Sequence, residues 1–283
     1  MFNFKAHLVA LSLVVALGTA DPTGLGFGEV DVVFPRNDTF ELMPLMPIVF
    51  AVQNPAAIGQ VYPTLEYMVS SLDTPSEDKI HWAQLPIRRL PANETTTTFL
   101  HDGLANRLNT ENMWEFAWTM RWTNCSTSDN GTAFDDDHGL DDQDGFHRRT
   151  SSPYQSFIFT TAKGGRQPNL TAISIGDDCG RTQALAFNVT QTLKVPTGPL
   201  RGDGVSSCAL LASPAPTPRP CKVSVAPEAA SSISSTLTHA ECYAATPAVS
   251  CPPKSDGAAV HGPSAQVAWW TASSAWLIYN IFR

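Results

Sequence analysis

The sequence predicts a mainly β protein, built as an antiparallel β-sandwich with a small disulfide-linked helical segment near the C-terminus. Short apolar runs recur between residues 28 and 195, and Pro, Asn and Gly turns separate them. The runs are not interrupted by long amphipathic helical patterns, and one run, residues 112–125, shows clear period-2 alternation. These features favour two packed sheets, with an immunoglobulin-like arrangement as the first choice and a jelly roll as the second.

The run at residues 112–125 is predicted to be the central strand, because one of its sides is aromatic and the other is mostly polar. A helix would turn two of the large apolar side chains away from the indoles, so the alternation favours a strand. Such a face is typical of a core, but a row of exposed indoles can also stack on sugar rings. The candidate platform is Trp114, Trp118 and Trp122, and it requires at least two of these three indoles to be exposed. Trp82 and the indoles of the C-terminal tail, Trp269, Trp270 and Trp276, are weaker candidates.

Eight further strands are predicted from apolar runs and the turn residues that bound them. The run at residues 46–53 ends at Asn54-Pro55, which is a turn signal, and residues 79–87 alternate less regularly. Residues 94–100 are rich in threonine, which suits an exposed strand. In chain order these strands cover residues 28–35, 46–53, 64–70, 79–87, 94–100, 154–161, 172–175 and 184–195.

A long acidic insertion, residues 126–152, interrupts the predicted sandwich domain of residues 21–200. It contains the runs DDD and DDQDG, and its polarity predicts a disordered loop. Carboxylates beside a glycine turn also suit calcium, but taking Gly145 as the turn glycine places Leu140 at the first ligand position and Ser151 at the last. The favoured interpretation is therefore a solvated acidic loop without a metal.

Two further segments are predicted beyond the sandwich. Residues 201–226 form a Pro-rich linker, in which SPAPTPRP is extended. Residues 227–256 form a short helical cap, because Pro227 suits the first helical position and Glu228 suits the first turn. An apolar stripe at helical spacing supports this helix: Ala230, Ile233, Leu237 and Ala240.

Residues 1–20 have the pattern of a secretory signal peptide. Lys5 precedes an apolar run from Leu8 to Leu17, and the small residues 18–20 offer a cleavage site after Ala20. The run is shorter than the about 20 residues that a membrane-spanning helix needs, which disfavours an N-terminal anchor.

The cysteines are even in number, so they are predicted to be paired in an oxidising compartment. Six cysteines allow 15 connectivities; we expect Cys125 to pair with Cys179 and the other four to pair among themselves. The CxxC spacing of a zinc site is absent from the sequence. The six are Cys125, Cys179, Cys208, Cys221, Cys242 and Cys251.

N-glycosylation sequons occur six times, and this density together with a signal peptide predicts a secreted glycoprotein. Each occupied site must face solvent, so the sequons also mark the expected surface. The acceptor residues are Asn37, Asn93, Asn124, Asn130, Asn169 and Asn188.

The C-terminus, residues 257–283, has the pattern of a signal for a GPI anchor. Small residues near Ser255, Asp256 and Gly257 are candidate attachment sites, and a short spacer separates them from an uncharged apolar tail. The tail is too short and too polar for a membrane-spanning helix, so the membrane is an expected partner only through this anchor. A plain secreted protein is the alternative.

The sequence lacks the motifs of the common enzyme mechanisms and cofactors. It has no GxSxG elbow, no HExxH pair, no phosphate-binding loop and no dinucleotide-binding glycine motif. The net charge of −8 disfavours a nucleic-acid partner, which would select a basic patch. Paired carboxylates of a glycoside hydrolase come from distant strands and give no spacing signal, so the enzyme question stays open and leans toward no.

Several segments together resemble an uncharacterised family of secreted fungal proteins. They are GEVDVVFPRNDTFELMPLMPIVFAVQNP, the tryptophan-rich strand ending in Asn-Cys, the run before Pro196, and PCKVSVAPEAASSISSTL. The resemblance covers roughly residues 26–245 and implies an extracellular protein with cysteines, a signal peptide and often a hydrophobic C-terminus. Because the family carries a domain of unknown function, it transfers no catalytic or ligand residue.

The sequence therefore predicts a glycosylated, disulfide-bonded extracellular protein attached to the cell surface or wall. The leading expectation is a non-catalytic binding or structural protein whose partner is a wall glycan or another surface protein. The alternative is a secreted hydrolase of wall glycans, which would show a pocket lined by two carboxylates with shifted pKa values.

Overall fold

The computed structural model describes residues 24–73, 79–85, 87, 96–124, 148–171, 183–194, 207–220 and 223–252. The chain divides into a unit of residues 1–249 and a second unit of residues 250–283. The first unit holds the strands and helices named below, and residues 250–252 are the described part of the second.

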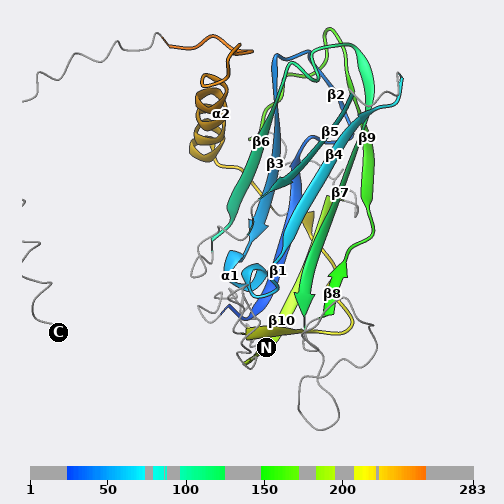
Figure 1. Ribbon diagram of the computed structural model, residues 1–283, viewed down its shortest axis with the longest axis vertical. Coiled ribbons are helices and arrows are strands. Elements are labelled where there is room, and N and C mark those ends of the chain that lie inside the picture. Colours follow the sequence, from blue (N-terminus) through cyan, green and yellow to red (C-terminus); the bar gives the residue numbers. More distant parts are fainter. Residues whose placement is uncertain are drawn as a thin grey trace, which may run out of the picture. The chain divides into compact units, whose positions relative to one another are not determined.

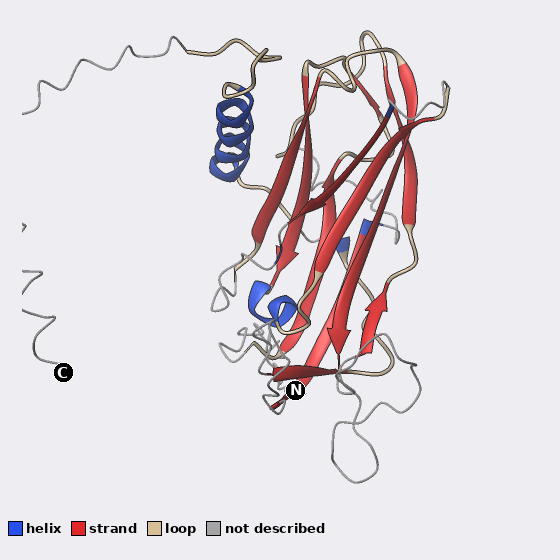
Figure 2. Cartoon of the chain, viewed as in Figure 1, coloured by secondary structure: helices blue, strands red, loops and turns tan. Residues whose placement is uncertain are grey.

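The strands form two antiparallel-rich sheets that pack together, which confirms the predicted β-sandwich (Figures 1 and 2). Sheet A contains, in spatial order, β11 (Ser207–Leu211), β10 (Ala184–Lys194), β1 (Gly26–Phe34), β3 (Leu45–Gln53) and β6 (Thr98–Ala105). Sheet B contains β2 (Thr39–Phe40), β9 (Gln155–Thr161), β7 (Asn112–Asn124), β4 (Thr64–Ser71) and β5 (Ile80–Leu85), and β8 (Arg148–Ser151) also pairs with β7.

An aromatic cluster joins the two sheets at the centre of the core. Phe50 of β3 lies 5.8 Å from Trp118 and 6.1 Å from Phe116, measured between ring centroids, and both partners belong to β7. Its ring also lies 6.3 Å from that of Tyr67 on β4. Because successive residues of a strand point to opposite faces, these contacts decide which face of each strand lies inside. The prediction that β7 is a core strand is therefore confirmed.

A short helix that the sequence analysis missed, α1 (Pro55–Gly59), follows β3 directly. Asn54 adopts a left-handed conformation with φ 52°, and its side-chain oxygen accepts a hydrogen bond from the backbone N–H of Ala57. Proline then occupies the first helical position, where its missing N–H costs nothing. Gly28 of β1 allows this helix to approach, since a Cβ atom at that position would lie 2.9 Å from Ile58.

The predicted C-terminal helix is present as α2 (Pro227–Glu241), and it packs on β6 and β3 of sheet A (Figure 1). Its buried side chains, Ile233 and Leu237, belong to the stripe that predicted it. Gly103 of β6 leaves room for Leu45 beside the helix, because a Cβ atom there would lie 2.9 Å from Leu45 and 3.4 Å from Leu237. Cys242, which ends the helix, is bonded to Cys251, as the predicted disulfide-linked segment requires.

Three expected boundaries differ from the structure. Residues 207–211 fall inside the expected linker but form β11, which pairs with β10 and extends sheet A. The strand expected at 94–100 is β6, displaced toward the C-terminus to Thr98–Ala105. The end of the expected insertion forms β8, paired with β7. The rest of that insertion, residues 126–147, and the strand expected at 172–175 lie outside the described residues.

Replacing the central phenylalanine should destabilise the whole sandwich. We expect Phe50→Ala to lower the free energy of unfolding by about 3–5 kcal/mol, because it leaves a cavity at the junction of the two sheets. Chemical denaturation measures this loss. Phe27→Ala, on the exposed start of β1, serves as the control and should change stability by less than about 1 kcal/mol. A similar small effect of Phe50→Ala would contradict the assigned core.

Candidate functional site

The three indoles proposed as a platform do not form one. Trp114 and Trp118 are buried in the core, and the indole Nε1 of Trp114 donates a 2.8 Å hydrogen bond to Thr161 Oγ1. Trp122 is half-buried, with its ring 4.8 Å from that of Phe187. The requirement that two of the three indoles be exposed is not met, because their side of β7 faces sheet A.

Among the weaker candidates, Trp82 faces solvent, with 57 % of its surface exposed, and the tail indoles lie outside the described residues. Its neighbour on β5, His81, points inward and approaches Tyr67 in the sandwich. Strand alternation therefore turns Trp82 to the outer face of sheet B, together with Gln84 two residues further on. The register places Trp82 opposite Met68 of β4. Trp82 thus lies on an edge strand, next to the polar pair Gln84 and Glu66.

A polar cavity of about 250 Å³ opens on the same outer face. The register aligns its residues across three strands: Glu66 pairs with Gln84 of β5, and Thr64 pairs with Arg121 of β7. Because Gln84 follows Trp82 on one face, the cavity begins about 7 Å from the indole position. The residues that line it are Tyr62, Thr64, Glu66, Gln84, Arg121, Trp122 and Thr123.

An ion pair forms the floor of this cavity. Arg121 Nη2 donates to Glu66 Oε2 at 2.5 Å, and the carboxylate side chain is nearly buried while the guanidinium is about half exposed. The two charges cancel, so the cavity offers fixed hydrogen-bond donors and acceptors without a net charge. Hydroxyl and amide groups from Thr64, Thr123 and Gln84 add further donors and acceptors. We call Trp82, Gln84, Glu66 and Arg121 the Trp82 site.

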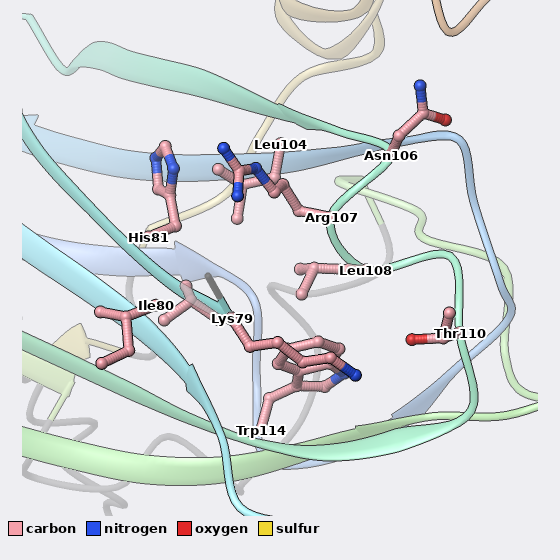
Figure 3. A pocket seen from close by; sticks show the side chains of 10 residues that line it. Lys79, Ile80, His81, Leu104, Asn106, Arg107, Leu108, Thr110 and Trp114 are labelled. Atoms are coloured by element: carbon pink, nitrogen blue, oxygen red, sulfur yellow. The ribbon is translucent and has the colours of Figure 1, made fainter. Parts of the chain in front are cut away.

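A second cavity, of about 210 Å³, lies at the edge where β5 of sheet B faces β6 of sheet A (Figure 3). Its apolar lining includes Leu104, Leu108 and Trp114, and the side chains of Lys79 and Arg107 also line it (Figure 3). The indole of Trp114 is almost completely buried beneath this cavity. The cavity is therefore a notch in the edge of the core, smaller than a typical small-molecule site.

Three titratable side chains meet next to this notch. The Tyr67 hydroxyl donates a 2.6 Å hydrogen bond to Asp102 Oδ2 and lies 3.3 Å from His81 Nε2. Burial alone would raise the pKa of Asp102, but hydrogen bonds from His81, Tyr67 and the backbone N–H of Gly103 outweigh it, so the pKa lies below its ordinary value. Burial and the nearby carboxylate raise the pKa of Tyr67. The cluster links β4 and β5 of sheet B to β6 of sheet A through side-chain hydrogen bonds.

A pair of carboxyl groups lies on the outer face of sheet A and is completely buried. Glu29 and Asp31 are two positions apart on β1, so their side chains lie on the same face. The backbone N–H of Arg219 donates to both carboxylate oxygens of Glu29, at 2.8 and 3.0 Å. Gln53 Nε2 donates to Asp31 Oδ2 at 2.8 Å. Desolvation, a hydrogen bond with Glu29 and the charge of Glu29 raise the pKa of Asp31 to about 9, although Gln53 and Arg36 act in the opposite direction.

These carboxyl groups do not form the pocket that a glycoside hydrolase requires. Asp31 has a strongly shifted pKa, but both it and Glu29 have no exposed surface with which to contact a substrate. Asp102 is partly exposed, and its nearest described titratable neighbours are a histidine and a tyrosine. Among the described residues, the expected pocket with two shifted carboxylates is therefore not found.

The structure places four of the six sequon asparagines. Asn37 and Asn169 are exposed, and Asn124 and Asn188 are half-buried on β7 and β10. Thr171 Oγ1 donates to Asn169 Oδ1 at 2.7 Å, so the acceptor and the hydroxyl of that sequon are in contact. Asn93 and Asn130 lie outside the described residues, as do the candidate anchor positions Ser255, Asp256 and Gly257.

Of the cysteines, Cys208 is disulfide-bonded, as are Cys242 and Cys251, and none of those that are described is free. The expected pair Cys125–Cys179 and the position of Cys221 lie outside the described residues.

Within the described ranges, no group of three or more His, Cys, Asp or Glu side chains is placed to hold a metal ion. In the same ranges, α1 and α2 are both too short or too polar to cross a membrane.

The fold and the site together define a class of protein: an antiparallel β-sandwich with an amphipathic site on the outer face of one sheet. A family model, the domain of unknown function DUF7136, matches residues 23–251. The chain therefore belongs to this family. Comparison with curated proteins and comparison with solved structures each found no match.

Sequence reasoning named Trp82 among the weaker platform candidates, but it did not bring Glu66, Gln84 and Arg121 together with it. The polar residues of β4 and β7 are isolated in sequence, and only the strand register brings Arg121 beside Glu66. The useful signal was the alternation of Trp82 and Gln84, which predicts that both lie on one face of a strand.

The buried carboxyl pair should make the protein more stable in acid. The folded state holds a proton on Asp31 between the ordinary pKa of 3.8 and the folded value of about 9, whereas the unfolded chain releases it. The free energy of unfolding should therefore fall as the pH rises through this range, by up to about 1.4 kcal/mol per pH unit. Asp31→Asn keeps a hydrogen-bond donor toward Glu29 without a titrating proton, so it should flatten this fall.

Chemical denaturation at a series of pH values measures both slopes. Well below the unfolded pKa of 3.8, the wild-type group is protonated in both states, so the two proteins should there have similar stability. A wild-type stability that rises from pH 5 to pH 8 while the variant stays unchanged would contradict the assignment.

Proposed function

We propose that this protein is a non-catalytic carbohydrate-binding protein of the cell surface or cell wall, and that it binds wall glycans at the Trp82 site. The observation that supports this most is the position of the exposed indole beside a polar cavity without net charge. Sugars present apolar C–H faces and hydroxyl edges, and an aromatic face next to fixed polar groups complements both.

The ion pair of the site also suits an uncharged ligand. Glu66 and Arg121 neutralise each other, and the half-exposed guanidinium of Arg121 has further N–H donors while the nearly buried carboxylate of Glu66 holds it in place. An anion would have to displace the carboxylate from Arg121, and a cation would have to displace the guanidinium from Glu66. A polyhydroxyl compound can instead accept hydrogen bonds from the exposed guanidinium without breaking the pair.

An extracellular location is part of the proposal. The signal-peptide pattern of residues 1–20, the density of sequons and the paired cysteines support secretion, and the resemblance to secreted fungal proteins agrees with them. The C-terminal pattern at residues 257–283 supports a GPI anchor with attachment near Gly257. The partner is then a glycan of the wall that the anchored protein faces, with another surface protein as the second candidate.

Secreted hydrolysis of wall glycans is the alternative function, and one assay separates it from binding. The full chain, secreted from a eukaryotic host, is incubated with polymeric β-glucan and chitin, and released oligosaccharides are measured. Binding without product supports the proposal, and product release that increases with protein concentration supports the hydrolase.

Removing the indole should remove glycan binding. We expect Trp82→Ala to weaken binding to insoluble wall glycan by at least about tenfold, since stacking on one aromatic ring contributes on the order of 1–2 kcal/mol with its buried area. Pull-down isotherms with the secreted full chain measure this. The exposed Trp82 makes few core contacts, so the variant should keep the wild-type thermal transition.

Tyr243→Ala is a matched control, because Tyr243 is 78 % exposed and follows α2, the helix that packs on sheet A. It should bind glycan as the wild type does. Equal binding by the wild type and Trp82→Ala would contradict the proposed site.

Treatment of expressing cells with phosphatidylinositol-specific phospholipase tests the anchor. We expect the protein to be released and the peptide of residues 267–282 to be absent from the mature chain by mass spectrometry. Retention on the cells, together with an intact C-terminal peptide, would contradict the anchor and leave the binding proposal unaffected.

A further inference from the structure

We infer that the ligand of the Trp82 site is an extended glycan chain that crosses the strands of sheet B, from Trp82 at the β5 edge to Tyr154 beside β9. This inference rests on the proposed glycan-binding function and adds the length and direction of the ligand. It follows from the strand order, the register and the exposure of the residues along this path.

Tyr154 is the second large aromatic group on the outer face of sheet B. The next residue, Gln155, pairs with Trp118, whose indole lies in the core. Alternation along the chain therefore turns Tyr154 outward, in agreement with its exposure of 69 %. It lies on the far side of β7 from Trp82, because the strand order is β9, β7, β4 and β5 (Figure 1).

Three strand spacings separate β5 from β9, and Tyr154 is offset by two residues from the row of Trp82, so the two aromatic side chains are anchored about 16 Å apart. One sugar ring stacks on one aromatic ring and does not span this distance. A ligand that contacts both therefore has several linked rings in an extended arrangement.

The outer face between the two aromatic side chains includes small and buried residues. The register places Met68 and Ala117 in the row of Trp82, and Ala117 is a small buried residue. Thr119, the next outward residue of β7, is also buried, and its hydroxyl bonds to Ser152. They form the floor between Trp82, in the row of Met68 and Ala117, and Tyr154, which lies one outward position further along, beside Thr119. The Glu66–Arg121 pair lies along one side of this floor.

The direction along β5 offers a poorer path. The outward neighbours of Trp82 on its own strand are Ile80 and Gln84, and neither provides a second ring for stacking. The pair of exposed rings is found across the strands, so the chain axis should run across them as well.

The experiment measures affinity against chain length with the secreted full-length protein. Soluble β-1,3-glucan and chitin oligosaccharides, from one to eight sugar units, are titrated by calorimetry. We expect affinity to rise steeply over the first several units and then to level off. Tyr154→Ala should weaken binding of the long oligosaccharides by about tenfold and leave the affinity for the shortest bound ligand unchanged. Tyr154→Trp should restore the long-chain affinity.

The outcomes separate this inference from the proposed function. Loss of binding at every length in Trp82→Ala, with Tyr154→Ala equal to the wild type, would overturn the crossing chain and retain the Trp82 site. Absence of any binding that depends on Trp82 would overturn the proposed function. Tyr243→Ala controls for loss of an exposed tyrosine elsewhere, and thermal transitions verify that each variant is folded.

Discussion

The contact between Phe50 of sheet A and the aromatic rings of sheet B determines the rest of the structure. It fixes the inner faces of β3, β4 and β7, and strand alternation then fixes their outer faces. The Trp82 site is a consequence of this constraint, because Glu66 and Arg121 are the residues next to buried Tyr67 and Met120. The orientation of these strands in the core thus places Glu66 and Arg121 on the outer face of sheet B.

The sequence was sufficient for the fold class because the decisive patterns are local. Alternation at residues 112–124 predicts a core strand, and the stripe containing Ile233 and Leu237 predicts α2. The linker prediction was wrong at β11 because the prolines that predict a linker lie in residues 213–220. The predicted linker also included the strand-forming residues SCALL, which precede this proline-rich stretch. The helix α1 has only five residues, which is too short for a periodic signal.

The site was less predictable than the fold, because it depends on register and exposure. An indole on a strand has the same local pattern whether it faces the core, as Trp118 does, or solvent, as Trp82 does. The sequence does not state that β4 lies between β5 and β7, and this order is what brings Gln84 and Arg121 to opposite sides of Glu66. Long-range pairing, rather than residue type, creates the cavity.

The contact between Arg219 and the buried carboxyl pair has a consequence for how this segment can vary. In the run Pro218-Arg219-Pro220, the middle residue alone has a backbone N–H, and that group is the donor to Glu29. Because the main chain supplies the hydrogen bond, the exposed arginine side chain can change to almost any other without removing the contact. Proline is the exception, so relatives should tolerate wide substitution at this position while avoiding a third consecutive proline.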